Sequence, residues 1–355
     1  MRSSPRSAVR DCYLGGGYVF AAKARDIAAE YGFDEVAQLA SNENPFPPSE
    51  KALAMASEAL LSVNRYPDSS HDALIAALES VHGWSPTVTG SGMDGVIETV
   101  VRTLISPGDL VAISSPTFSF YDLAVRAQGG TIRHVPRGPG YTVNTDTFID
   151  AAREAKLSFI CSPNNPTGNV TDPGDIAAIL DEIEGILFLD NAYVEFADAE
   201  YIPLLSEYDN LIIGRTMSKV HGLAGLRIGY AFVPAWYAPC YHAAATPFAL
   251  NMVSAAAAVG ALSDPEYARR FIAHVRRWRE IFEETIPYPV VPGGANFVLI
   301  NTNPISSRDA VKSLARKGVL VRSCDSFPGL GETFIRVSIG TDWECERFLE
   351  AIRSL

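Results

Sequence analysis

Lys219 is the residue whose type and setting first indicate chemistry. It lies in RTMSKVHGLAGLRIGY (215–230), a mostly apolar stretch in which Arg227 follows eight residues later. A buried ammonium group is costly unless it is paired or neutralised. Lys219 is therefore either a solvent-facing residue at the end of a strand or an amine with a chemical task. Partial burial and nearby cations would favour the unprotonated amine, which is a nucleophile.

Polar segments close several apolar runs, and each of them could carry part of a site. They are GSGMDG (90–95), SPNNPTG (162–168), LDNAY (189–193) and RTMSK (215–219). Taken alone, each segment is also typical of an ordinary turn or helix cap. Because the carboxyl ends of parallel strands meet at one edge of a sheet, the four segments together predict a single site there.

The elements that would position these segments alternate between strand and helix over about residues 85–235. This alternation predicts an α/β fold with a mainly parallel sheet. The expected strands are 109–114, 131–136, 157–162, 185–190, 210–215 and 227–233, and the expected helices are 94–105, 120–129 and 172–184.

In the C-terminal third the expected helices and strands follow a different order, which predicts a smaller α+β domain. A long helix is expected over 264–285, further helices near 307–317 and 343–353, and strands in ANFVLIN (295–301), GVLVRS (318–323) and TFIRVSI (333–339). The N-terminal segment carries one helix-like stretch at 20–32. We therefore predict a large domain over 42–245, an N-terminal arm over 1–41 that packs with the small domain, and the small domain over 246–355.

Composition excludes several classes of function. The 355 residues carry a net charge of −12, which disfavours nucleic acid and anionic membranes as partners. The apolar run 247–262 is too short to span a bilayer and predicts a packed helix. The six histidines form no HExxH or HxH cluster, so no metal site is expected. Five scattered cysteines and a start without an apolar signal region predict a soluble protein of the reducing cytoplasm.

Five motifs, in this order along the chain, resemble those of one enzyme family. They are NENP (42–45), NRYPD (64–68), NNPTG (164–168), DNAY (190–193) and SK followed by LAGLRIGY (218–230). The sequence resembles the fold-type-I, pyridoxal-phosphate-dependent aminotransferases, and among them the histidinol-phosphate aminotransferases. The resemblance runs from about Tyr13 to the RVSIGT segment near the C-terminus.

The resemblance implies a site for pyridoxal 5′-phosphate. In this family the lysine forms an imine with the cofactor aldehyde, a role that falls to Lys219, and the freed amine then moves a proton between the substrate Cα and the cofactor carbon. Asp190 would face the ring nitrogen and favour its protonated form. Asn165 and Tyr193 match positions that hydrogen-bond the ring oxygen. Phe118 matches the ring-stacking position, where tyrosine is common.

The resemblance also implies a cradle for the cofactor phosphate at a helix N-terminus. A hydroxyl group and a guanidinium would add a charge-assisted clamp. The expected groups are the backbone amides of Met93, Asp94 and Gly95 and the side chains of Ser218 and Arg227.

Tyr66, in NRYPD, matches the residue that reaches the cofactor phosphate of a neighbouring subunit. The resemblance therefore implies a homodimer with a shared active site. The alternative is a tyrosine that only packs against the turn at Pro67.

Substrate recognition is expected from two arginines of the small domain. Arg322 and Arg336 lie in apolar strands, where an arginine is costly without an anionic partner. The family pattern makes both of them binders of a substrate anion, and the alternative for Arg336 is a salt bridge to a nearby Asp or Glu. Asn42 and Tyr13 complete the predicted substrate site. Two arginines with Tyr13 suit a phosphate ester better than a lone carboxylate.

The predicted activity is a two-step, ping-pong exchange of an amino group between L-histidinol phosphate and 2-oxoglutarate. The partners are thus a small-molecule amino donor and a 2-oxo acid. The alternatives that share the same cofactor site are an aromatic or broad-specificity aminotransferase and a threonine-phosphate decarboxylase. A non-catalytic protein that binds pyridoxal phosphate is the alternative from a different class.

Overall fold

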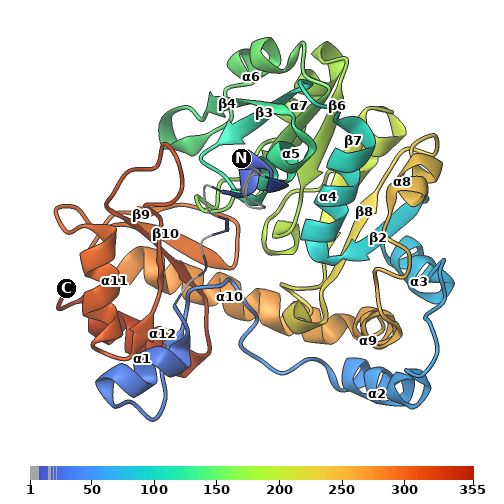
Figure 1. Ribbon diagram of the computed structural model, residues 1–355. Coiled ribbons are helices and arrows are strands. Elements are labelled where there is room, and N and C mark those ends of the chain that lie inside the picture. Colours follow the sequence, from blue (N-terminus) through green and yellow to red (C-terminus); the bar gives the residue numbers. More distant parts are fainter. Residues whose placement is uncertain (1–7, 15–16, 19, 21) are drawn as a thin grey trace, which may run out of the picture.

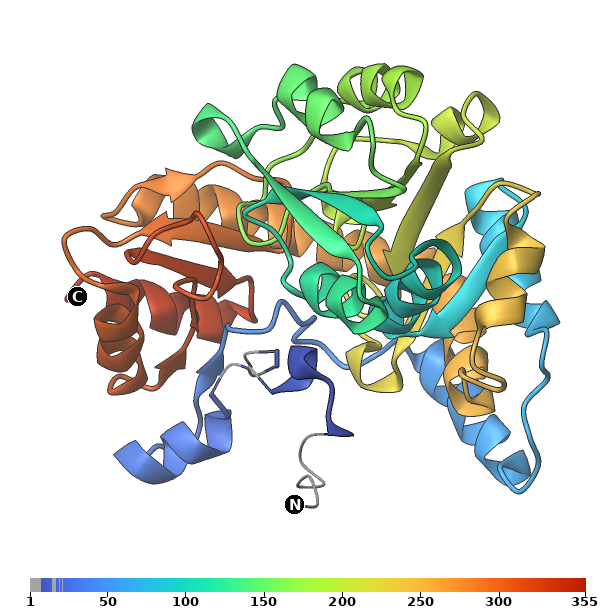
Figure 2. The same cartoon turned by 45° about the horizontal axis from the view of Figure 1, so that its top comes forward.

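The computed structural model describes residues 8–14, 17–18, 20 and 22–355. A large sheet covered by helices lies beside a smaller unit, and the long helix α10 (Pro265–Thr285) runs along both (Figure 1). Figure 2 shows the chain around residues 37–48 crossing from the small unit to α2 (Glu50–Ala59) on the far side of the large one. The candidate site residues are carried by both units.

The large sheet has seven strands, one more than the sequence predicts. All of its neighbours pair in parallel except β8, which runs antiparallel to β7 and β2. The spatial order is β2 (Thr87–Ser91), β8 (Ile228–Phe232), β7 (Leu211–Thr216), β6 (Ile186–Asp190), β5 (Leu157–Cys161), β3 (Leu110–Ser115) and β4 (Thr131–Pro136). Gly90 and Ser91, the first residues of GSGMDG, therefore end strand β2.

Helices cover both faces of this sheet, which explains why its central strands are continuous apolar runs. Phe159 of β5 and Phe188 of β6 belong to the cluster on the side of α4 and α5. Ile160 and Leu187, one residue away on the same strands, belong to the cluster on the side of α6 and α7. The four helices are α4 (Gly92–Leu104), α5 (Phe120–Gln128), α6 (Thr145–Ala152) and α7 (Pro173–Glu182).

Further helices cover the β2–β8 end of the sheet on both faces. Helices α2, α3 (Asp72–His82) and α9 (Met252–Leu262) pack on one face, and α8 (Ala238–Ala244) packs beside α4 on the other. Helices α2 and α9 approach closely, since a Cβ at Gly260 would lie 2.5 Å from the carbonyl oxygen of Lys51. Helix α9 is the packed helix expected within 247–262, and it lies against α2 and α3. The domain division at residue 246 remains a prediction, and it would assign α9 to the small domain.

The small unit is built on an antiparallel sheet in the order β12 (Arg322–Ser323), β13 (Phe334–Ser338), β10 (Phe297–Asn301) and β9 (Val290–Val291). Helices α10, α11 (Ser307–Ala315) and α12 (Asp342–Ile352) cover it. The N-terminal helix α1 (Ala24–Tyr31) leads into β1 (Ala37–Gln38), which pairs in parallel with β11 (Val319–Leu320). This pairing supports the expected packing of the N-terminal arm on the small unit.

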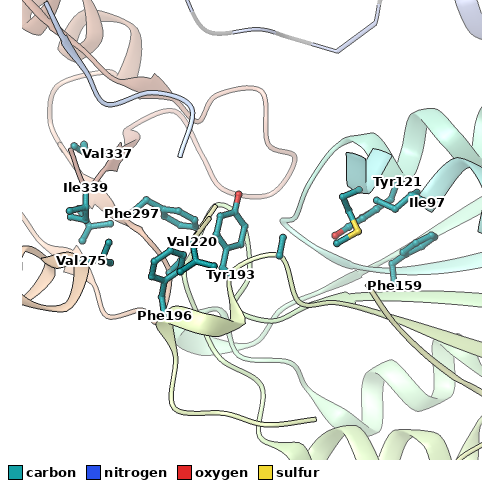
Figure 3. Packing of buried hydrophobic residues seen from close by; sticks show 14 of the residues in the cluster. Ile97, Tyr121, Phe159, Tyr193, Phe196, Val220, Val275, Phe297, Val337 and Ile339 are labelled. Atoms are coloured by element: carbon teal, nitrogen blue, oxygen red, sulfur yellow. The ribbon is translucent and has the colours of Figure 1, made fainter. Parts of the chain in front are cut away.

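One apolar cluster joins the two units. Figure 3 shows Tyr193, Phe196 and Val220 of the large unit beside Phe297 and Val337 of the small one. Short 3-10 helices complete the secondary structure at η2 (Asp11–Tyr13), η3 (Leu60–Ser62), η4 (Pro139–Tyr141), η5 (Val194–Phe196), η6 (Ile202–Ser206) and η7 (Ala224–Leu226). Among the described residues, no helix is long and apolar enough to cross a membrane.

Candidate active site

A cavity of about 380 Å³ lies at the carboxyl ends of β5, β6 and β7, between the two units. Most of the site residues predicted from the sequence line it. They are Asn42, Met93, Asp94, Phe118, Asn165, Asp190, Tyr193, Ser218, Lys219, Arg227, Arg322 and Arg336. The parallel sheet thus brings the strand-end segments together as expected.

Lys219 lies in the turn after β7 with its side chain half-buried against the cavity. Its Nζ is 5.4 Å from the centroid of the Tyr193 ring. Burial, followed by repulsion from Arg336, lowers the pKa of Lys219 to about 8. Among the described residues, no carboxylate lies within salt-bridge distance of Lys219, so the amine can lose its proton near neutral pH. This setting favours an amine with a chemical task over a solvent-facing lysine.

Asp190 ends β6 and is 3% exposed. Tyr121 Oη donates a 2.6 Å hydrogen bond to one carboxylate oxygen, and the backbone amide of Ala192 donates a 3.0 Å bond to the other. Burial raises the pKa of Asp190 to about 6, and the two bonds oppose the rise. The carboxylate is therefore ionised at neutral pH. Tyr121 was missed from the sequence, although it stands only three residues after Phe118.

Arg336 of β13 holds Asn165 and carries an uncompensated charge. Its Nη1 donates a 2.5 Å hydrogen bond to Asn165 Oδ1, and its Nη2 a 2.7 Å bond to the carbonyl of Ala40. The buried Nε has no hydrogen-bond partner among the described residues. The alternative of a salt bridge is wrong for the described residues, since none of their carboxylates lies within 4 Å of this guanidinium. Because Asn165 accepts through its oxygen, its amide NH₂ is left to donate into the cavity.

Arg322 lies beside Arg336, directly across the β12–β13 pair. It is 9% exposed, and its one side-chain hydrogen bond within the described part of the chain is a weak one of 3.3 Å to Ser326 Oγ. Burial, and then the charge of Arg336, lower the pKa of Arg322. Two adjacent buried cations in a cavity wall provide a strong site for an anion.

Asn42 is bonded to both units. Its Nδ2 donates to Tyr193 Oη at 3.1 Å, and its Oδ1 accepts from Ser338 Oγ at 3.0 Å. Its backbone carbonyl accepts from Asn296 Nδ2 at 3.1 Å. Burial raises the pKa of Tyr193, which keeps its hydroxyl protonated and able to donate. Asn42 therefore shapes the cavity wall, and its role in direct contact with substrate remains a prediction.

The predicted phosphate cradle is the start of α4. Gly92 has φ 72°, and a Cβ there would lie 2.4 Å from Arg227 Nη2. Arg227 itself has φ 53°, and its Nη2 donates a 3.0 Å bond to Asp94 Oδ2. The amides of Met93 and Asp94 belong to the first turn, where no carbonyl of the same helix can accept them. These free donors and the guanidinium form an anion site.

Three predicted residues lie away from the cavity. Gly95 lines a separate depression. Its amide is in position to donate the first hydrogen bond within α4, unlike the amides of Met93 and Asp94. Tyr66 is 80% exposed and stacks on Phe248, with 4.7 Å between ring centroids. Tyr13 is 59% exposed and does not line the cavity. Tyr18 lines it instead, edge-on to Phe118 with 6.0 Å between ring centroids.

The residues present fit an aromatic phosphate that carries an aldehyde. The first turn of α4 and Arg227 provide for a phosphate, Phe118 offers an aromatic face, and Asp190 provides a buried anion for a protonated ring. Lys219 supplies an amine with a lowered pKa. No cluster of metal-ligating side chains is found in the part of the chain that the structure describes.

The fold and site define a fold-type-I aminotransferase. The profile of the class I and II aminotransferases matches residues 34–352, and the chain belongs to this family. It is 59% identical to the histidinol-phosphate aminotransferase of Methanoculleus marisnigri, over 99% of this chain and 100% of that protein. It is also 59% identical to the enzyme of the same name from Methanocorpusculum labreanum, over 98% and 99% of the two chains.

Solved structures agree with this assignment. The histidinol-phosphate aminotransferase of Sinorhizobium meliloti, in complex with pyridoxal-5′-phosphate, superposes with a TM-score of 0.88 at 25% identity, over 98% of each chain. The enzyme of that name from Clostridium acetobutylicum has a TM-score of 0.85 at 23% identity, over 90% of this chain and 98% of that one, and shows the fold alone.

Proposed function

We propose that this protein is a pyridoxal-phosphate-dependent histidinol-phosphate aminotransferase of histidine biosynthesis, which exchanges the amino group between L-histidinol phosphate and 2-oxoglutarate. The 59% identity to enzymes of that name over nearly the whole chain supports the activity. The single structural observation that carries it is Lys219, an amine of lowered pKa, in a cavity that also presents two buried arginines, to which the described residues offer no carboxylate partner.

The chain's own groups would hold the cofactor as follows. The amides of Met93 and Asp94, with Ser218 and Arg227, bind the phosphate. When bound, pyridoxal 5′-phosphate supplies an aldehyde that captures the substrate amine and a ring that accepts electrons from the Cα–H bond. The remaining contacts come from Asp190 at the ring nitrogen, Asn165 and Tyr193 at the ring oxygen, and Phe118 on the ring face.

Lys219 would carry the proton of the reaction. Its pKa of about 8 lies close to neutral pH, so its amine can both accept and return a proton at the substrate Cα. Arg336 and Arg322 bind the phosphate of L-histidinol phosphate and, in the second half-reaction, a carboxylate of 2-oxoglutarate. Both arginines are buried, at 7% and 9% exposed, which limits the competition from water.

The proposal includes a homodimer in the cytoplasm. An exposed apolar surface surrounds Tyr66, and a second copy of the chain would cover it, so that Tyr66 reaches the cofactor phosphate of the partner. Its exposed residues are Leu60, Leu61, Val63, Tyr66 and Phe248. The cysteines that the structure describes are free thiols, which suits a reducing compartment.

Four measurements test this function. The loaded protein should turn over L-histidinol phosphate with 2-oxoglutarate far faster than phenylalanine, whereas a preference for phenylalanine would indicate an aromatic aminotransferase. Release of carbon dioxide from threonine phosphate would indicate a decarboxylase. Sedimentation should give a dimer, and mixed dimers of Tyr66→Phe and Lys219→Ala chains should regain part of the activity that each variant lacks alone.

A further inference from the structure

The NENP motif contains one polar residue, Glu43, that neither the fold nor the proposed chemistry uses. Its two neighbours are fixed by hydrogen bonds. Asn42 is bonded to Tyr193 and Ser338, and Asn44 Nδ2 donates 3.1 Å bonds to the carbonyl of Val220 and to Tyr267 Oη. Asn42 adopts φ 54°, a left-handed conformation that asparagine tolerates better than most residues. The backbone of Glu43 is therefore held on both sides.

The carboxylate of Glu43 is at the same time free. The residue lines the mouth of the cavity and is exposed. Within the described residues, no hydrogen bond or ion pair engages this carboxylate. The other two acids of the cavity are both engaged, Asp94 by Arg227 and Asp190 by Tyr121 and the Ala192 amide. Glu43 is thus the one cavity acid of the described chain available to a ligand.

Glu43 is also electrostatically close to the reacting amine. Its negative charge opposes the lowering of the Lys219 pKa, which burial and Arg336 cause. Arg336 is tied to the loop that carries Glu43, because its Nη2 donates to the carbonyl of Ala40 three residues earlier. The cavity therefore presents Lys219 together with a cationic wall, Arg322 and Arg336, and a separate anionic group, Glu43.

We propose that Glu43 is the acceptor for a ring N–H of the substrate's imidazole and so selects an imidazole-bearing amino donor. This inference rests on the proposed function. L-histidinol phosphate carries a phosphate for the arginines, an amine for Lys219 and an imidazole. One ring nitrogen of a neutral imidazole donates a hydrogen bond, both donate in the cation, and the ring is partly cationic near pH 6.5. A carboxylate binds such a group well. The same charge disfavours the side-chain carboxylate of glutamate at that position.

The experiment compares two amino donors in Glu43→Gln. The amide keeps the size of the side chain and removes its charge. For L-histidinol phosphate kcat/KM should fall about tenfold, the order expected for one charge-assisted hydrogen bond. For glutamate, kcat/KM should stay within about twofold of the wild-type value or rise, because the repulsion between Glu43 and the side-chain carboxylate of glutamate is removed. Glu284→Gln, an exposed acid of α10 far from the cavity, is the matched control and should change neither value.

A binding measurement separates recognition from catalysis. In a Lys219→Ala background, which removes the proposed proton carrier, titration calorimetry compares L-histidinol phosphate with O-phosphoethanolamine, which lacks the imidazole. Glu43→Gln should weaken only the former. If Glu43→Gln lowers kcat/KM equally for the two amino donors and weakens the binding of the two ligands equally, this inference is wrong, while the proposed function still stands. A wild-type protein that uses glutamate but not L-histidinol phosphate would overturn the proposed function and this inference with it.

Discussion

Tyr121 donates a 2.6 Å hydrogen bond to Asp190, a residue 69 positions later in the chain. Both side chains are buried, and the Tyr121 ring stacks on Phe159 with 4.6 Å between centroids. The bond fixes one oxygen of the carboxylate while the Ala192 amide fixes the other. Asp190 is therefore held in one orientation at the bottom of the cavity before any ligand enters.

Tyr121→Phe should weaken cofactor binding in a pH-dependent way. The pKa of Asp190 is about 6, and loss of the Tyr121 bond raises it further. The carboxylate then becomes protonated at a higher pH. The pH below which pyridoxal phosphate binding weakens should therefore rise. Near pH 7 the Kd should rise by on the order of tenfold, as expected for one lost bond to a charged group. A fluorescence titration between pH 5 and 8 measures both effects.

Tyr201→Phe is the control for this variant. Tyr201 is another buried tyrosine, which bonds Ser162 and does not line the cavity. Its loss should lower Tm without moving the pH dependence of binding. If cofactor binding by Tyr121→Phe weakens at the same pH as in the wild type, the bond does not govern the charge of Asp190.

Asp190→Asn should stabilise the cofactor-free protein while it impairs function. The folded-state pKa of about 6 lies above the ordinary value of 3.8, so the buried charge costs stability above pH 6, and this cost disappears as the pH falls toward 4. The amide of asparagine can keep both contacts if its oxygen accepts from the Ala192 amide and its NH₂ donates to the Tyr121 hydroxyl. At pH 7.5 the variant should gain about 1–3 kcal/mol in the free energy of unfolding. Urea unfolding at pH 7.5 and pH 4.5 checks this, since the gain should shrink at the lower pH.

Gly92→Ala should abolish the phosphate cradle. Alanine is strained at φ 72°, and its Cβ would lie 2.4 Å from Arg227 Nη2. We expect a loss of about 2 kcal/mol or more in stability and a large loss of cofactor affinity. Gly95→Ala is the matched control, because its Cβ would make ordinary van der Waals contacts, with Ser91 Cβ at 3.4 Å and the Gly90 carbonyl carbon at 3.7 Å. It should bind the cofactor as the wild type does, and an equal loss in both variants would contradict the assignment of the cradle to the first turn.

Arg336→Lys should impair every anionic donor. Lysine keeps the charge but cannot bond Asn165, the Ala40 carbonyl and a substrate anion at once. We expect kcat/KM to fall by about a hundredfold, or roughly 3 kcal/mol, for L-histidinol phosphate and for glutamate alike. Steady-state kinetics with both donors test this. A normal kcat/KM for either donor would show that Arg336 has only a structural role.

The sequence predicts most of the large sheet, because buried parallel strands appear as continuous apolar runs. It missed β2, since Thr87–Ser91 contains two threonines, a glycine and a serine and has no such run. The antiparallel direction of β8 could not be predicted from the sequence either. It depends on which strands become neighbours in the sheet, and the local residue pattern does not show this.

The site was predictable where strand ends converge and less so elsewhere. Asp190 and Lys219 follow directly from their strands, whereas Tyr18 lies in an N-terminal segment without a strand or helix to place it. Tyr18 lines the cavity and Tyr13 does not, so the role of Tyr13 stays a prediction. The hydrogen-bond acceptors of Arg336 could not be predicted from the sequence either. Asn165 and the Ala40 carbonyl come from segments that only the tertiary fold brings together.

Visible absorbance of the protein loaded with pyridoxal 5′-phosphate tests the central role of Lys219 most directly. The wild type should show a visible band that L-histidinol phosphate removes and 2-oxoglutarate restores, whereas Lys219→Ala should complete no such cycle. A Lys219→Ala protein that cycles as fast as the wild type, or a wild type without any visible band in excess cofactor, would contradict the account.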